Sequence, residues 1–295
     1  MAGESRESRY FGGRVAIVTG ASSGIGRALA LGLARSGCKV GLLARRRSLL
    51  EEVVGQIEIQ GGTAAWATAD VTDRDQIRQA FDDLTSRLGP ASIVVANAGV
   101  GVPTTLEPMN ITTIETMIKV NVLGLIYTIE AALPAMLDQK SGQIAAISSL
   151  SAYKGMPGES AYCASKAAIN AYMEGLRVQV RDRGIAVTTI CPGFVKTPMT
   201  DIDGFPMLFP MEAEEAADRV IKALRKRSKV VNFPWQTTAM IKLARWMPDW
   251  VLARIFRHHL ENPPMLHPST IVRTIAEPPT VPKNSTTAPS PRGGW

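Results

Sequence analysis

The chain has 295 residues, of which 45% are hydrophobic and 20% are charged, a balance typical of a globular protein with a buried core. Its net charge of +7 is spread along the sequence without interleaved aromatic residues, which argues against a nucleic-acid partner; a phosphorylated cofactor or an anionic membrane surface would account for the excess. Three scattered cysteines indicate free thiols in a reducing cytoplasm, with neither a disulfide framework nor a metal site.

The first predicted element is a strand at residues 14–19 (RVAIVT), a short β-branched run that we expect to be buried. It leads into the glycine turn 20–26 (GASSGIG) and then into an apolar helix that closes at Gly37. Glycines let the backbone approach a pyrophosphate, and a helix N-terminus offers free N–H groups and a positive dipole end. The pattern predicts half of a mononucleotide-binding unit, with these cofactor-binding candidates: Gly20, Ser22, Ser23, Gly24, Ile25 and Gly26.

A second predicted strand, 39–44 (KVGLLA), runs directly into three arginines. A site that prefers NAD(H) usually has an acidic residue about 20 residues past the glycine turn, on the ribose 2′-hydroxyl. Here Ala44 and Arg45 occupy that place, and an arginine can pair with a 2′-phosphate. The sequence therefore favours NADP(H) over NAD(H). For Arg46 and Arg47, the start of a solvated helix is an equally good interpretation.

The third and fourth predicted strands also end in candidate cofactor contacts. Residues 63–69 (TAAWATA) lead to Asp70, whose carboxylate could accept a hydrogen bond from an adenine amino group. Residues 92–96 form the fourth strand. The candidates that follow these two strands are Asp70, Val71, Asn97, Ala98 and Gly99.

The catalytic candidates surround the fifth predicted strand, 143–148, which arrives at Ser149. On the helix that follows, Tyr162 and Lys166 are four residues apart and share one face. A cation beside a phenol favours the phenolate, and moving a tyrosine pKa three units toward neutrality requires roughly 4 kcal/mol. Such a tyrosine can exchange protons with an alcohol or ketone, while Ser149 donates a hydrogen bond to the same oxygen. Alone, this spacing also fits a solvated helix face.

The remaining strands complete an alternating pattern. Residues 185–190 predict a sixth strand, stopped by Pro192 and Gly193, and 229–232 predict a short last one. The alternation predicts an α/β fold: one doubly wound, Rossmann-like parallel sheet of about seven strands in the order 3-2-1-4-5-6-7, with a C-terminal helical extension. The expected organisation is an N-terminal arm (1–12), a dinucleotide-binding and catalytic domain (13–232), the extension (233–260) and a disordered Pro/Ser/Thr-rich tail (261–295).

Together these residues resemble a single-domain short-chain dehydrogenase/reductase over about residues 13–232. TGASSGIG is similar to the family's cofactor loop, ADV to its adenine-side acid and NAG to its fourth-strand signature. The resemblance implies that Asn121, inside a predicted helix over 112–137, joins the catalytic set Ser149, Tyr162 and Lys166. PGFVKT is similar to the segment that binds the nicotinamide carboxamide, with contacts expected from Pro192, Gly193, Val195 and Thr197.

The resemblance also implies roles. Tyr162 would be the general acid in reduction and the base in oxidation, and Lys166 would lower its pKa and hold the nicotinamide ribose. Asn121 would hold a proton-relaying water, whereas Asn97 would make a structural hydrogen bond beside the cofactor. We therefore expect an NADP(H)-dependent oxidoreductase acting on the carbonyl or alcohol of a small, lipophilic molecule. The alternative is a non-catalytic cofactor sensor or scaffold on the same fold.

Two regions point to further contacts. The resemblance implies a homodimer or homotetramer through the helices at 112–137 and 160–183, and a substrate lid near residues 200–211. Residues 235–260 predict basic amphipathic helices with tryptophans, which could cover the substrate pocket, pack on a second subunit or lie on a membrane surface. The first two interpretations are favoured over the peripheral membrane contact.

Overall fold

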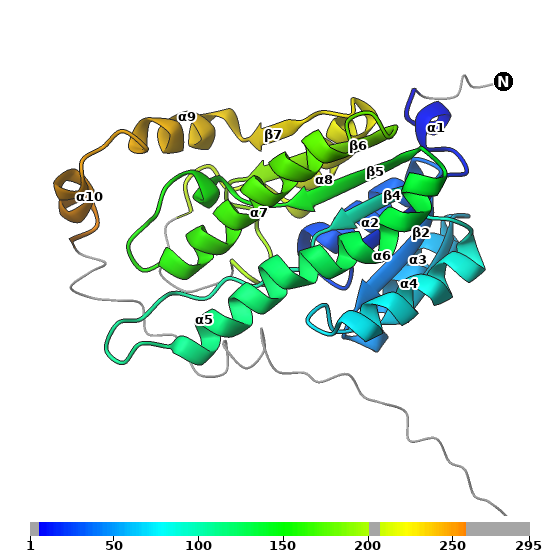
Figure 1. Ribbon diagram of the computed structural model, residues 1–295, viewed down its shortest axis with the longest axis horizontal. Helices are drawn as coiled ribbons and strands as arrows, with labels where there is room; N and C mark the ends of the chain where they lie inside the picture. Colours follow the sequence, from blue (N-terminus) through cyan, green and yellow to red (C-terminus); the bar gives the residue numbers. More distant parts are fainter. Residues whose placement is uncertain (1–5, 201–206, 258–295) are drawn as a thin grey trace, which may run out of the picture.

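The structure, a computed structural model, describes residues 6–200 and 207–257. Its centre is a seven-stranded, all-parallel sheet in the order β3-β2-β1-β4-β5-β6-β7, which confirms the predicted fold class (Figure 1). The strands are β1 Val15–Thr19, β2 Lys39–Ala44, β3 Thr63–Thr68, β4 Ile93–Ala96, β5 Gly142–Ile147, β6 Ile185–Pro192 and β7 Val230–Phe233. The helices between them are α1 Arg6–Phe11, α2 Gly24–Arg35, α3 Arg47–Ile59, α4 Arg74–Leu88, α5 Ile111–Ile118, α6 Gly124–Asp138, α7 Ser160–Gln179 and α8 Ala213–Arg225.

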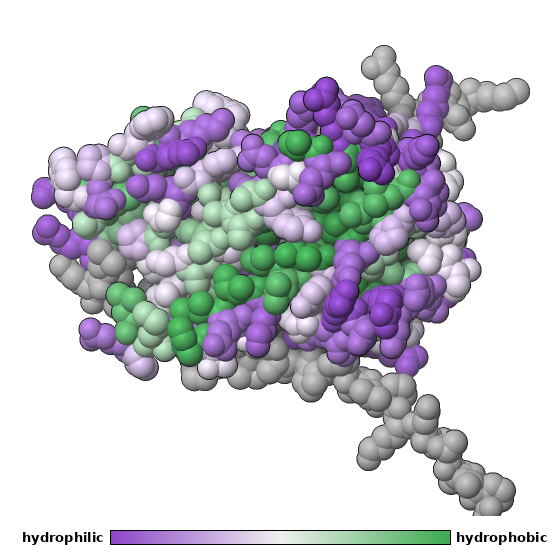
Figure 2. All heavy atoms as spheres, in the orientation of Figure 1, coloured by the Kyte–Doolittle hydropathy of each residue, from purple (hydrophilic) through white to green (hydrophobic). Residues whose placement is uncertain are grey.

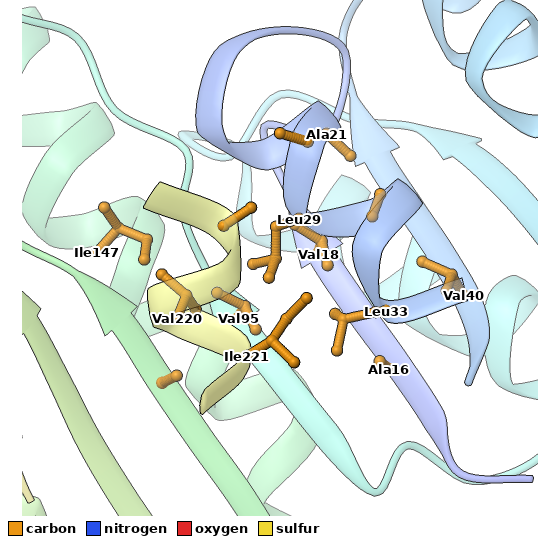
Figure 3. Packing of buried hydrophobic residues seen from close by; sticks show 14 of the residues in the cluster. Ala16, Val18, Ala21, Leu29, Leu33, Val40, Val95, Ile147, Val220 and Ile221 are labelled. Carbon is orange, nitrogen blue, oxygen red and sulfur yellow. The ribbon is translucent and has the colours of Figure 1, made fainter. Parts of the chain in front are cut away.

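The central strands are apolar along their whole length because helices cover both faces of the sheet. Every residue of β1, β4 and β5 is buried. One face packs against α2, α3 and α8, where Leu29, Leu33 and Ile221 meet strand residues such as Val18 (Figure 3). The other face packs against α4, α6 and α7. Phe11, from the predicted N-terminal arm, is fully buried in the first of these layers.

The long helix predicted over 112–137 is three segments in the structure. A five-residue π-helical turn, Lys119–Leu123, separates α5 from α6 and carries Asn121. Such turns are rare and occur mostly at functional sites. By length and composition the whole stretch Ile111–Asp138 could span a membrane. Leu125, Ile129 and Met136 of this stretch are buried against the sheet.

The C-terminal extension forms two short helices after β7. They are α9 Trp235–Ala244 and α10 Asp249–Ile255. The expected tail 261–295 lies outside the described residues, as do residues 201–206 of the expected lid. Because all strands are parallel, the segments that follow β1, β2, β3, β4, β5 and β6 meet at one edge of the sheet, where ligands bind in folds of this class.

Candidate active site

The glycine turn after β1 is closely packed at each of its glycines. Gly20 and Gly24 have φ values of +66° and +53°, which side chains rarely permit. A Cβ at Gly26 would lie 2.3 Å from the carbonyl oxygen of Gly20, and one at Gly20 would lie 2.9 Å from the Cα of Ala98. The turn is therefore a bare backbone cradle at the N-terminus of α2, which fits the pyrophosphate of a dinucleotide.

Each of the three arginines after β2 has a different partner. Arg45 lies 3.8 Å from the carboxylate of Asp70, at the end of the neighbouring strand β3. Arg46 donates hydrogen bonds to the hydroxyls of Ser22 and Ser23, at 3.0 and 2.8 Å. The structure thus joins Arg46 to the glycine turn, whereas from the sequence the start of a solvated helix was an equally good interpretation for this residue. Arg47 pairs with Glu51 on the surface of α3.

The loop after β4 connects the glycine turn to the catalytic candidates. On one side, the Asn97 amide donates to the carbonyl oxygen of Thr19 at 2.9 Å, the structural hydrogen bond expected of it. On the other, a Cβ at Gly99 would lie 3.2 Å from Asn121 Oδ1 and 3.4 Å from Lys166 Nζ. A Cβ at Gly101 would lie 3.3 Å from the Tyr162 ring. The absence of a side chain at Gly101, which sequence reasoning missed, therefore leaves room for the phenol ring.

The four catalytic candidates come together beside this loop. Ser149 follows β5 and is hydrogen-bonded to the phenol of Tyr162, which reaches it from the first turn of α7. Lys166, one turn further, is buried, donates to the carbonyl oxygen of Ile147 at 3.0 Å, and lies 5.6 Å from the centre of the Tyr162 ring. Asn121 is joined to Val100 by two hydrogen bonds and to Ser165 on α7 by a third.

Burial determines the protonation of this group. It raises the pKa of Tyr162 above its ordinary value, and the hydrogen bond from Ser149 opposes the rise. The same burial lowers the pKa of Lys166 to about 8. The direction for Tyr162 is opposite to the one we predicted from Lys166, because desolvation of the phenolate is the largest influence on this pKa.

A carboxylate that the sequence did not single out acts on the same phenol. Burial raises the pKa of Glu159, at the start of α7, to about 7, and its charge raises the pKa of Tyr162. An acid whose pKa is raised in the folded state contributes stability below its unfolded pKa, and this contribution is lost as the pH rises through about 7.

Glu159→Gln is therefore expected to stabilise the protein by about 1–2 kcal/mol at pH 8 and to change little at pH 5. Thermal unfolding at the two pH values measures the difference. Glu174→Gln, exposed on the same helix, controls for the loss of one charge. Equal melting shifts at both pH values would mean that the Glu159 carboxyl is not destabilised by burial.

The segment 192–197 completes the site. Pro192 ends β6, and Gly193 follows it against Leu150 and Thr237. Val195 forms a bridge to Met211, and a Cβ at Gly24 would lie 3.0 Å from the Thr197 methyl group, so this segment reaches the glycine turn. Among the residues described, no three His, Cys, Asp or Glu side chains gather as metal ligands.

Comparison with known proteins agrees with this geometry. The family model for short chain dehydrogenases matches residues 14–203. An uncharacterized oxidoreductase of Myxococcus xanthus is 39% identical over 236 residues, covering 80% of this chain and 93% of the relative. A 3-ketoacyl-ACP reductase from Sinorhizobium meliloti is similar in structure, with a TM-score of 0.68, 34% identity and coverage of 74% and 96%. Levodione reductase is similar with a TM-score of 0.71, 26% identity and coverage of 78% and 99%.

Proposed function

The chain belongs to the short-chain dehydrogenase/reductase family of NAD(P)-dependent oxidoreductases, and we propose that it transfers hydride between NADP(H) and the carbonyl or alcohol of a small, lipophilic molecule. One observation carries this proposal. A Cβ at Gly20 would lie 2.9 Å from the Cα of Ala98, and one at Gly99 would lie 3.4 Å from Lys166 Nζ. The loop 97–101 therefore lies between the cofactor cradle and the catalytic side chains, next to both.

The residues present fit a nicotinamide dinucleotide. The cradle at Gly20, Gly24 and Gly26 would hold the pyrophosphate, Asp70 the adenine side, and Val195 and Thr197 the carboxamide, while Lys166 would hold the nicotinamide ribose. The cofactor, when bound, supplies the hydride. The protein supplies orientation and proton transfer.

In the reductive direction, the Tyr162 hydroxyl donates its proton to the substrate carbonyl oxygen, and the Ser149 hydroxyl donates a hydrogen bond to the same oxygen. A phenol ordinarily has a pKa of about 10 and therefore carries a proton to give at neutral pH. Burial raises the pKa of Tyr162 further, and the hydrogen bond from Ser149 opposes that rise. Asn121 positions this group: its amide is joined to Val100 and to Ser165, so it ties the β4 loop to the helix that bears Tyr162 and Lys166.

The preference for NADP(H) rests on Arg45 and Arg46. Both guanidinium groups lie beside the turn or strand end where a 2′-phosphate would sit, and each charge-assisted contact contributes about 1.5–3 kcal/mol. Arg45→Ser and Arg46→Ser are each expected to lower kcat/KM for NADPH by about 10- to 100-fold and to change kcat/KM for NADH far less. Arg47→Ser, in the same run but paired with Glu51, is the matched control. An unchanged NADPH/NADH ratio in both variants would reject the assignment.

The substrate side of the site favours a lipophilic molecule. Met199 lies beside Gly101 near the Tyr162 ring, and Leu208 and Phe209 are exposed just after the undescribed residues 201–206. A screen of ketones, steroids, quinones and fatty-acyl derivatives, followed by the absorbance of reduced nicotinamide, tests this. NADPH binding without turnover of any of them would favour the alternative of a cofactor sensor.

We also propose a cytoplasmic homo-oligomer. The face along α5, α6 and α7 is hydrophobic (Figure 2), and Leu123, Tyr172 and Val178 are exposed there. Two copies that meet through this face would bury these side chains. Light scattering would measure the resulting mass.

A further inference from the structure

Helix α9 exposes several large apolar side chains. None of its ten residues is buried, and its outward side carries Trp235, Met240 and Leu243, the first 74% exposed. The side chains of Thr237 and Thr238 are partly buried; the former contacts Gly193, and the hydroxyl of the latter donates to Pro234. A helix on a water-soluble domain normally turns its apolar stripe toward the core. On α9, Ile241 and Ala244 are only partly buried, and the largest apolar side chains of the helix stay exposed.

The next helix also exposes large apolar side chains. Trp246, in the turn before α10, is 85% exposed, and Trp250 and Ile255 on α10 are exposed as well. Leu252 is the one buried residue of α10. Exposed large apolar side chains that gather in one place mark an interaction site, unlike those scattered singly over a surface.

Basic side chains are interleaved with these apolar ones. Residues 235–257 contain four basic residues and a single acidic one, Asp249. The four are all exposed, and none takes part in an ion pair with another described residue: Lys242, Arg245, Arg254 and Arg257. The surface formed by residues 235–257 thus combines exposed apolar side chains, tryptophans among them, with a net positive charge.

The 235–257 surface lies beside the segments that follow β5 and β6, next to the candidate active site. In Figure 1, α9 and α10 extend beyond the carboxyl ends of β5 and β7, at the same end of the molecule as the start of α5. Lys154, in the segment after Ser149, donates to the carbonyl oxygen of Met247 at 3.5 Å. Leu106, Met109 and Ile111, before and at the start of α5, add exposed apolar side chains at that end.

We propose that the 235–257 surface docks on an anionic lipid membrane, with its tryptophans in the interfacial layer and its basic side chains on the headgroups. Tryptophan prefers that layer because its ring is apolar and its N–H is polar, and basic residues near an anionic leaflet strengthen binding. A second copy of the chain fits less well. A dimer formed through this surface would bury its four cations, whereas the centres of protein interfaces are depleted of charge.

Co-sedimentation of the full chain with phosphatidylcholine vesicles, with and without phosphatidylglycerol, tests the proposal. We expect binding that requires phosphatidylglycerol and weakens as sodium chloride is raised. Lipids brominated in the acyl chains should quench tryptophan fluorescence, and Trp246→Phe/Trp250→Phe should remove most of that quenching. This readout is independent of any enzymatic activity.

Two double variants separate the contributions. Trp246→Ser/Trp250→Ser and Lys242→Glu/Arg245→Glu should each weaken vesicle binding by about tenfold or more. The charge-matched control is Lys226→Glu/Lys229→Glu. These exposed residues precede β7, at the end of the strand opposite to α9, so this variant should bind vesicles like the parent. Because every changed side chain is exposed, circular dichroism should be unaltered. The proposal is overturned if all variants bind alike, if binding does not depend on phosphatidylglycerol, or if the tryptophan variant dissociates a dimer instead.

Discussion

Tyr162→Phe is expected to lower kcat by about 10³-fold while leaving the binding of NADPH nearly unchanged. The substitution removes the hydroxyl that is hydrogen-bonded to Ser149 and keeps the ring that packs against Gly101. The proton donor is therefore lost while the ring still fills its place in the site. The turnover that remains measures how much catalysis comes from orienting substrate and cofactor alone. Stopped-flow turnover and fluorescence titration with NADPH measure the two quantities.

The matched control is Tyr172→Phe, on the same helix and partly exposed. It removes an identical atom away from the site and should keep normal turnover. The pH dependence supplies a second check. Because burial raises the pKa of Tyr162, reduction should stay fast through neutral pH, whereas oxidation, which needs the phenolate, should accelerate into the alkaline range. Near-normal activity in Tyr162→Phe would refute its role as general acid.

Lys166→Met is expected to lower kcat by about 10²-fold or more without destabilising the fold. The amine is buried and donates to Ile147, and the lowering of its pKa to about 8 corresponds to roughly 3 kcal/mol of cost for the charged form. Methionine fills the same space and removes that cost, while the lost hydrogen bond costs about 1–3 kcal/mol. The two terms nearly cancel, so activity falls while stability is kept.

The pH dependence of the free energy of unfolding distinguishes the loss of a buried amine in Lys166→Met from a simple packing change. Between about pH 8 and 10.5 the unfolded chain binds more protons at Lys166 than the folded one, so the parent gains stability as pH rises through this window. The methionine variant lacks this gain. Denaturant unfolding at pH 7 and 10 would show it, with Lys222→Met, exposed on α8, as the control. A parent whose stability is flat over this range would contradict the buried ammonium.

Much of the fold could be predicted from local pattern. The strands are continuous apolar runs because helices cover both faces of the sheet, and the glycine turn, Asp70, the NAG segment and Ser149 each follow such a run. Parallel strands bring those ends to one edge, so sequence order alone predicted that the candidate site residues would lie close together. The spacing of Tyr162 and Lys166 required only the helical repeat.

Tertiary structure decided what depends on burial and on partners distant in sequence. The π turn around Asn121 gave no periodic signal, since the apolar pattern runs unbroken through it. Burial reversed the direction predicted for the Tyr162 pKa, and a contact across 23 residues brought Arg46 to Ser23. The composition of α9 indicated apolar and basic residues, but which of them face outward depends on how the helix packs beside Gly193. Local sequence determines the elements and their ends, whereas desolvation and long-range contacts determine what the side chains at those ends can do.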